Sequence, residues 1–444
     1  MGEKELLLDK YRRYLFLPRN IIVLYLFATI ILYFFGPVKW RIDNGLELFL
    51  YVTVNYACVW IGYTWFMKNH TRSYKIYERV LDNDEFIHHE GLLRGVFIFS
   101  IVSHFVYSFY AHGGISIERL LNMAQSYLDN RVYEQEYNRY TQILTYLWGI
   151  NYFALPCGIV LFKKLKTIDK VLFFGSLATE VMFWLSIGTM KGIGDIAFTA
   201  LIPFLVISIK GKKSTTELKR SWDKRKRLIL VLAIIVFVLF GYSSLNRYVL
   251  RGHTTFSAIN RQMAPFVEKE VMWPFAEATN SLIVDFTHGY TGLAYAFKLP
   301  FEWTYFVGNS RALTHTIERM LNTTAITDAT YCQRLQIVYG WANGSIWPTA
   351  FTWLASDFTF WFIPALLIMV SYLWAKSIYE ALIDSNIVSL VYSTYLTIFM
   401  FYLPMNNQIV QAERSLYSLV LLTLLYIFNS SKFTLTFGKT KLKI

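Results

Sequence analysis

The chain has 444 residues, of which 55% are hydrophobic and only 16% are charged, and its mean hydropathy is +0.36. Soluble domains carry about 25% charged residues. A chain this apolar has too little polar surface to coat one globule, so the composition excludes a water-soluble enzyme and indicates a protein with several membrane spans. The formal charge of +13 comes from 43 Lys and Arg against 30 Asp and Glu.

Ten apolar stretches approach the length of a membrane-spanning helix, which needs about 20 residues. In chain order they are residues 20–35, 48–67, 95–110, 143–162, 171–190, 192–209, 228–242, 358–374, 387–404 and 416–428. The predicted fold class is therefore an all-α integral membrane protein with about ten transmembrane helices.

The positions of the basic residues predict the orientation. The segments before the first span and after every even-numbered span hold 28 of the 43 Lys and Arg, whereas the short loops on the other side hold seven. Because positive charge is retained on the cytoplasmic side, both termini are predicted to be cytoplasmic. The basic block 210–227 is interpreted as part of this orientation signal, and no nucleic-acid partner is expected.

One large loop between the seventh and eighth spans divides the predicted chain into three parts. These are residues 1–247 with seven spans, 248–357 as an extracytoplasmic loop, and 358–444 with three spans. Within the loop, 281–297 is apolar and 301–306 is rich in aromatic residues, so this part is predicted to lie along the membrane surface. Aromatic rings pack against the apolar faces of ligands, which makes Tyr290 and Trp303 candidate substrate contacts.

Several cations near the outer face are candidates for binding an anionic group. A guanidinium is planar and always charged, so it binds phosphate or pyrophosphate in a bidentate manner. The candidates are Arg247, Arg251, Arg311 and Arg334, together with Lys191 in a short outer turn. The alternative for each arginine is an interfacial side chain whose head reaches into water.

Three other residues of the large loop are candidates for moving a proton. His288, Asp285 and Glu302 share an apolar neighbourhood, where desolvation raises the pKa of a carboxylate and favours neutral histidine. Any of them can be a general base, and the alternative is a hydrogen-bonded structural role. Asp357 precedes the eighth predicted span, where capping of the helix N-terminus is an equally good interpretation.

Glu180 and His104 lie inside predicted spans. Ionisable groups at that depth are costly, so a functional role is the default hypothesis; a buried structural hydrogen bond is the alternative. No cluster of His, Cys and acidic residues has the spacing of metal ligands, so neither a metal nor another cofactor is expected.

Local motifs carry a resemblance to a known family. Gly188-Thr189-Met190-Lys191-Gly192 is similar to a Gly-Ser-Arg/Lys-Gly turn between central spans, and residues 288–300 and 308–310 are similar to a Gly-Tyr-rich run followed by a Gly-x-Gly/Asn-Ser element. Residues 349–358 resemble a Thr-rich approach to Asp-Phe-Gly, with Thr359 in place of the glycine. With the topology, these motifs resemble the Wzy-type polymerases of O-antigen and capsular polysaccharide and the related bundles of C-type glycosyltransferases and O-antigen ligases.

The resemblance implies inverting, metal-independent glycosyl transfer at the outer face of a bacterial inner membrane. Undecaprenyl-pyrophosphate-linked repeat units are the implied substrates, with arginines stabilising the pyrophosphate leaving group and a base accepting the hydroxyl proton of the acceptor. The lipid bilayer and a chain-length regulator protein are the implied partners. Two alternatives stay open: an O-antigen ligase, which has the same donor chemistry, and a lipid-linked oligosaccharide flippase or secondary transporter, which needs a water-lined cavity with two gates.

Overall fold

The protein is described by a computed structural model, which covers residues 3–71, 86, 90–122, 125–126, 139–189, 191–212, 214–251, 266–267, 274–341, 346–430, 434–437 and 440–443. Inside two helices, the side chains of 243–251 and 274–281 lie outside the described part as well. The predicted contacts of Arg247 and Arg251 therefore lie outside the described side chains.

Helices make up most of the described chain. The first half contains α1 (Glu3–Leu15), α2 (Leu17–Phe35), α3 (Gly45–His70), α5 (Glu90–His112), α6 (Ile117–Leu121), α8 (Arg139–Leu147), the 3-10 helix η1 (Trp148–Phe153), α9 (Ala154–Leu161), α10 (Thr167–Ser186) and α11 (Lys191–Ile209). The second half contains α12 (Thr215–Arg251), α14 (Pro274–Ala296), α15 (Arg311–Leu321), α16 (Ala325–Ala329), α17 (Tyr331–Tyr339), α18 (Ala350–Ile383), α19 (Ile387–Tyr402) and α20 (Glu413–Ser430).

Two small antiparallel sheets accompany the helices. One pairs β1 (Val38–Lys39) with β2 (Phe266–Val267), and the other pairs β3 (Thr434–Phe437) with β4 (Thr440–Lys443). The first sheet joins the turn after α2 to a segment that follows α12.

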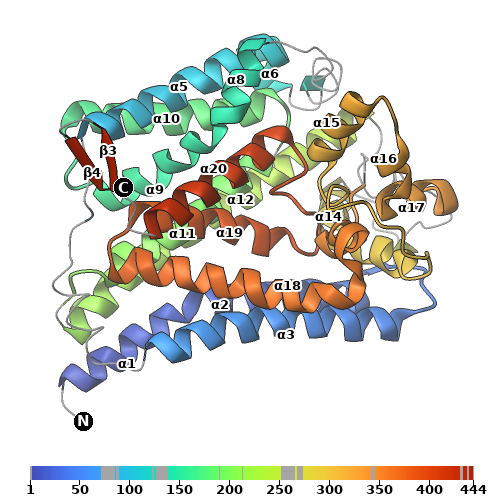
Figure 1. The fold of residues 1–444 in the computed structure, drawn as a ribbon, viewed down its shortest axis with the longest axis horizontal. Helices are drawn as coiled ribbons and strands as arrows, with labels where there is room; N and C mark the ends of the chain where they lie inside the picture. Colours follow the sequence, from blue (N-terminus) through green and yellow to red (C-terminus); the bar gives the residue numbers. More distant parts are fainter. Residues whose placement is uncertain are drawn as a thin grey trace.

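The long helices lie roughly side by side in layers (Figure 1). One layer contains α2, α3 and α18, a middle layer contains α11, α12, α19 and α20, and a third contains α5, α8 and α10. Both chain ends lie at one end of this bundle, whereas α14 to α17 gather at the other (Figure 1). The helices α14 to α17 thus form a cap over one end of the bundle.

Among the described residues, six helices are long and apolar enough to cross a membrane, which confirms an integral membrane protein of mainly helical fold. They are Leu17–Phe35, Gly45–His70, Glu90–His112, Arg139–Leu161, Lys191–Ile209 and Ala350–Ile383. Each of the ten predicted apolar stretches overlaps a helix, but the full number of ten spans stays a prediction.

The packing of α3 against α18 depends on a glycine. A Cβ atom on Gly62 would lie 2.1 Å from the hydroxyl oxygen of Ser371 and 2.3 Å from the carbonyl oxygen of Ile368. Small residues allow membrane helices to approach this closely. Fully buried side chains also pack between these two helices. The rings of Tyr63 on α3 and Trp374 on α18 lie 4.9 Å apart.

A sharp kink divides α18. Thr359 has φ 58° and ψ 156°, a backbone conformation that glycine adopts far more easily than threonine. Pro364 then removes the amide that would donate to the carbonyl of Phe360, and the hydroxyl of Tyr51 donates to that carbonyl instead, at 3.0 Å. The break begins at the position of the glycine in the Asp-Phe-Gly motif that residues 349–358 resemble. Thr359 therefore adopts a backbone conformation typical of glycine.

The start of α18 corrects one prediction. The helix begins at Ala350, with the Thr349 side chain accepting a hydrogen bond from the Thr352 amide as its N-cap. Asp357 lies in the last turn before the break at Thr359, and its carboxylate accepts hydrogen bonds from Thr304, Gly308 and Asn309 rather than from amides of α18, so the capping interpretation of Asp357 is wrong. The break at Thr359 lies next to the boundary predicted between residues 357 and 358.

Candidate functional site

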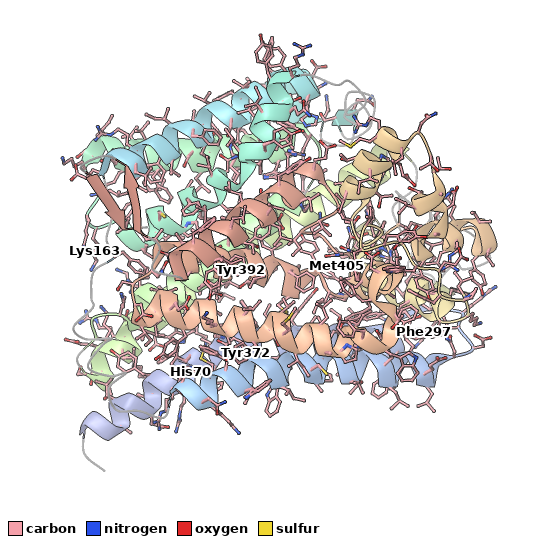
Figure 2. The ribbon with its side chains drawn as sticks, in the orientation of Figure 1. His70, Lys163, Phe297, Tyr372, Tyr392 and Met405 are labelled. Carbon is pink, nitrogen blue, oxygen red and sulfur yellow. The ribbon has the colours of Figure 1, made fainter. Side chains whose placement is uncertain are left out.

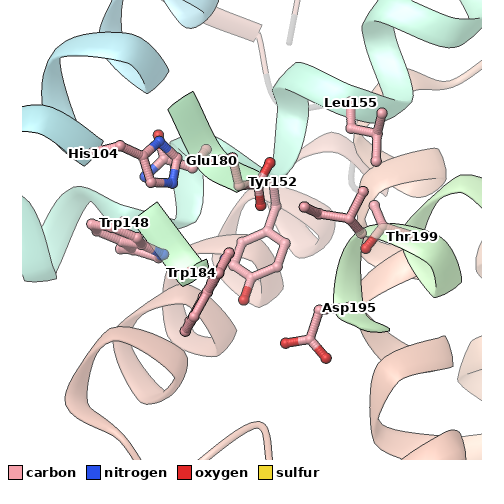
Figure 3. Close-up of a pocket in the computed structure, with 10 residues that line it drawn as sticks. His104, Trp148, Tyr152, Leu155, Glu180, Trp184, Asp195 and Thr199 are labelled. Atoms are coloured by element: carbon pink, nitrogen blue, oxygen red, sulfur yellow. The ribbon is translucent and has the colours of Figure 1, made fainter. Parts of the chain in front are cut away.

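A polar cavity lies inside the otherwise apolar bundle (Figure 3). Its walls come from α5, η1, α9, α10 and α11, and its lining includes Glu180 and Asp195 together with the polar side chains of Asn151 and Thr199. His104 belongs to the same lining. The two residues that the sequence singled out inside predicted spans, Glu180 and His104, are therefore neighbours of one cavity.

Aromatic rings form another part of the cavity wall. Trp148 and Tyr152 come from η1, whereas Trp184 comes from α10 (Figure 3). His104 packs between Trp148 and Phe183, with ring centroids 5.1 and 5.2 Å away. Its Nδ1 shares a 2.6 Å hydrogen bond with the Ser100 carbonyl, which fixes the orientation of the imidazole.

Two cations border this cavity. Lys191 forms an ion pair with Asp195, with Nζ 3.5 Å from Oδ2, and Nζ also lies 5.6 Å from the centroid of the Trp184 ring. The guanidinium carbon of Arg414 lies 5.6 Å from the same ring. Cations are attracted to the faces of aromatic rings, so Trp184 helps to hold both charges inside the bundle.

Arg414 is enclosed by aromatic rings. Besides Trp184, its guanidinium carbon lies 4.6 Å from the ring of Tyr107, 5.1 Å from Trp148 and 5.4 Å from Phe183. Its Nη1 is buried without a hydrogen-bond partner among the described residues. A buried donor therefore has unused hydrogen-bonding capacity near this cavity, where a ligand or water can use it.

The cavity lies toward the capped end of the bundle. Lys191 is the first residue of α11 and Arg414 the second of α20, and the segment between α19 and α20 contacts the large loop through Gln411. The side chain of Gln411 accepts from the Arg311 amide at 3.1 Å and donates to the Asn309 carbonyl at 3.0 Å. Figure 2 shows Met405 of this segment beside α14 and Lys163 at the opposite end.

His288 occupies a second, separate position on α14. Its Nδ1 shares a 2.6 Å hydrogen bond with the Val284 carbonyl, and its ring stacks on Trp341 at 6.3 Å. The residue is 6% exposed, and its Nε2 is buried. Burial lowers the pKa of His288, against the opposing effect of the nearby, half-buried Asp285, so the imidazole is held neutral.

Arg311 lies close to the surroundings of His288. The main chain of Trp347 lies against the His288 ring, and the Arg311 guanidinium carbon is 5.8 Å from the centroid of the Trp347 ring. The predicted base and one predicted anion-binding arginine therefore flank the same tryptophan. Arg311 is exposed, whereas His288 is buried, so only the arginine is accessible to a large ligand in this structure.

Glu302 and Arg334, predicted for different roles, are paired with each other. Arg334 Nη1 lies 3.0 Å from Glu302 Oε1 and donates to the Pro300 carbonyl at 2.7 Å, while Nε donates to the Ala329 carbonyl at 3.1 Å. Only 8% of Arg334 is exposed. These bonds tie the segment after α14 to α17, and they give Arg334 a structural role.

Tyr290 and Trp303, the two predicted sugar contacts, differ in exposure. Tyr290 has no exposed surface, and its hydroxyl hydrogen-bonds to those of Thr29 at 2.6 Å and Tyr56 at 2.5 Å. It docks α14 onto α2 and α3, so it offers no surface to a sugar in this structure. Trp303 is 48% exposed and available for contact.

Sequence reasoning missed Arg414 and the pairing of Asp195. Asp195 follows Lys191 by one helical turn, a spacing that predicts a side-chain pair on a helix. No local pattern marks Arg414, because the rings around it come from α5, η1 and α10. Among the described residues, no group of three or more His, Cys, Asp or Glu side chains converges as metal ligands do.

Comparisons with models of known protein families, with curated proteins and with solved structures find no match to this chain.

Proposed function

We propose that this membrane protein is a glycosyltransferase that polymerises polyprenyl-pyrophosphate-linked oligosaccharide repeat units at the outer face of a bacterial inner membrane. The observation that carries the proposal is the pair of cations, Lys191 and Arg414, beside a cavity that holds the carboxylates of Glu180 and Asp195. Such charges are expensive inside a membrane protein, and a functional role is their default explanation.

Glycosyl transfer needs cationic groups and a base. As the bond between the anomeric carbon and the pyrophosphate oxygen breaks, negative charge develops on the pyrophosphate, and fixed cations stabilise it. Lys191 and Arg414 supply these cations. The hydroxyl oxygen of the incoming sugar attacks the anomeric carbon from the opposite face, which inverts its configuration.

The hydroxyl proton goes to a base during this attack. Asp195 is the base in this proposal, because its carboxylate lines the cavity and its Oδ2 lies 3.5 Å from Nζ of Lys191. The products are a lengthened glycan and a free polyprenyl pyrophosphate, with no metal required in the step. His288, held neutral by burial, is the alternative base.

The orientation predicted by the basic residues supports the same proposal. If both chain ends are cytoplasmic, then α14 to α17 cover the outer end of the bundle (Figure 1), and the N-termini of α11 and α20 lie toward that end. Lipid-linked substrates then approach from the outer leaflet. Ten spans, cytoplasmic termini and a chain-length regulator partner belong to this proposal.

A flippase or secondary transporter is the second candidate. One observation favours it: the cavity is lined by helices of the bundle, with no lining residue from α14 to α17 among the described residues. An O-antigen ligase differs from the polymerase only in its acceptor.

The test is a reconstitution. Purified protein is incubated with a synthetic polyprenyl-pyrophosphate repeat unit, with and without lipid A core, and the products are resolved by size. A ladder from the repeat unit alone supports a polymerase, and a single transfer that needs lipid A core supports a ligase. Unchanged substrate that nevertheless crosses the bilayer of a vesicle would replace the proposal with a flippase.

A further inference from the structure

The segment between α14 and α15 exposes a group of large aromatic side chains. Trp303 is 48% exposed, Tyr305 67% and Phe306 56%. Tyr305 and Phe306 also have φ values of 56° and 62°, a region that bulky residues avoid. Side chains in such a conformation persist only where the surrounding structure enforces it.

Asp357 enforces this conformation. Its Oδ1 accepts hydrogen bonds from the Thr304 hydroxyl at 2.5 Å and the Gly308 amide at 3.2 Å, and its Oδ2 accepts two from Asn309, at 2.8 Å from the amide and 2.5 Å from the side chain. The carboxylate is buried, with the residue 4% exposed. One buried carboxylate therefore clamps both ends of the strained turn.

The exposed rings continue onto α18. Phe306 lies 5.4 Å from Phe358, which stacks on Phe362 at 5.8 Å. Phe362 is 52% exposed, and its neighbour Trp361 is 93% exposed. The aromatic surface of the turn is thus continuous with the outward face of a helix that is apolar and long enough to span the membrane.

The length of α18 places this surface at a particular depth. The part after the kink, from Phe360 to Ile383, rises about 36 Å at 1.5 Å per residue. A bilayer has a hydrocarbon core of about 30 Å, so Trp361 and Phe362 lie near one boundary of that core. Trp and Tyr are enriched at this boundary because their rings have apolar bodies and polar edges.

We propose that the aromatic turn, defined as residues 303–306, inserts into the headgroup region of the bilayer beside α18 and anchors the cap of α14 to α17 to the membrane surface. The occupant of this surface is lipid. The inference depends on the membrane fold alone and is independent of the proposed enzymatic activity.

The experiment measures the surroundings of single residues in the reconstituted protein. Tyr305→Cys and Phe306→Cys are each labelled with an environment-sensitive fluorophore in vesicles of phosphatidylethanolamine and phosphatidylglycerol. The three native cysteines are buried and unbonded, so unsubstituted protein reports background labelling. Ala325→Cys, on the exposed start of α16, is the matched control in the same cap.

The anchor predicts that lipids carrying a quencher near the headgroup quench labels at 305 and 306 several-fold more than at 325, while aqueous iodide shows the reverse order. Equal quenching by iodide at all three positions, without quenching by lipid, would overturn the proposal. If soluble glycan, and not lipid, protected the labels at 305 and 306 from iodide, the proposal would be overturned in favour of a sugar-binding surface. Either reporter position gives a result if the other variant fails to fold.

Discussion

Lys191 and Arg414 place their cationic groups at the same distance, 5.6 Å, from the ring of Trp184. They come from α11, which ends at Ile209, and α20, which begins at Glu413, so the two residues are far apart in the sequence. One indole therefore holds two positive charges beside the carboxylates of Glu180 and Asp195. Evolution rarely retains such a costly arrangement in a membrane bundle unless the charges act on something.

Removal of either cation is the first prediction. Lys191→Ala and Arg414→Ala should each lower the polymerisation rate by roughly 100-fold to 1000-fold, the effect of losing one group that stabilises transition-state charge. Arg414→Lys should retain part of the rate, because charge is kept while the planar stacking is lost. Rates are measured on purified protein, with detergent-solubilised yield as a check on folding.

Arg319→Ala is the matched control for the arginine variant. Arg319 lies on α15 and faces Glu413 at 3.8 Å, with both side chains largely in solvent. An exposed pair of this kind contributes little, so the rate should stay unchanged. If Arg319→Ala lowered the polymerisation rate as much as Arg414→Ala, the enclosure of Arg414 by aromatic rings would give it no special role.

The clamp around Asp357 gives the second prediction. Asp357→Asn replaces a carboxylate that accepts four hydrogen bonds, and hydrogen bonds to charged groups contribute about 1.5–3 kcal/mol each. The variant should lose roughly 2–4 kcal/mol of stability and become sensitive to proteolysis between α14 and α15. Glu118→Gln, at an exposed carboxylate on α6, should leave both properties close to those of the unsubstituted protein.

The contact between α3 and α18 gives the third prediction. Gly62→Ala should destabilise the protein by about 1–3 kcal/mol, the usual effect of overpacking a close contact, because a Cβ there meets Ser371 and the backbone of Ile368. Gly95→Ala on α5 meets nothing within 4 Å and should be tolerated. Thermal unfolding in detergent compares the two, and equal melting temperatures would contradict the packing account.

His288 gives the fourth prediction, a dependence of stability on pH. Burial lowers its pKa below the usual 6.5, so the unfolded chain binds a proton more readily than the folded one. Stability should therefore be fully present above pH 6.5 and fall as the pH drops below this value. His288→Gln should flatten this part of the profile, and an unchanged profile would contradict the buried neutral state.

The same substitution distinguishes the two candidate bases. If Asp195 accepts the hydroxyl proton, Asp195→Asn abolishes polymerisation while His288→Gln retains it. The opposite pattern transfers the role to His288. Folding of both variants is checked by their elution as single species after purification.

Chelation gives the fifth prediction. The two cations and the carboxylates of the proposed mechanism need no metal ion, so excess chelator should leave the rate of the purified protein unchanged. A complete loss that added divalent ions restore would contradict a metal-independent step.

The helices could be predicted from sequence because long apolar runs need only local information. The kink in α18 was not predicted, because it depends on the positive φ of Thr359 and on the hydroxyl of Tyr51 from another helix. The helix also starts earlier than its predicted span, because Thr349 caps it before Ala350 and residues 350–357 are buried within the protein.

The site was only partly accessible to sequence reasoning. Lys191, Glu180 and His104 were singled out by their charge within apolar surroundings, and they lie at or beside one cavity. Arg414 was counted only as a loop charge, because its four aromatic neighbours are brought together by tertiary packing. Tyr290 matched a motif but is fully buried, since a motif does not specify which face of a helix meets a neighbour.

The most direct test of the central claim uses the purified, unsubstituted protein and one synthetic polyprenyl-pyrophosphate repeat unit. The account predicts a ladder of glycans, each one repeat unit longer than the last, with release of free polyprenyl pyrophosphate. A substrate that stays one repeat unit long, under conditions in which the protein is folded and binds it, would contradict the account.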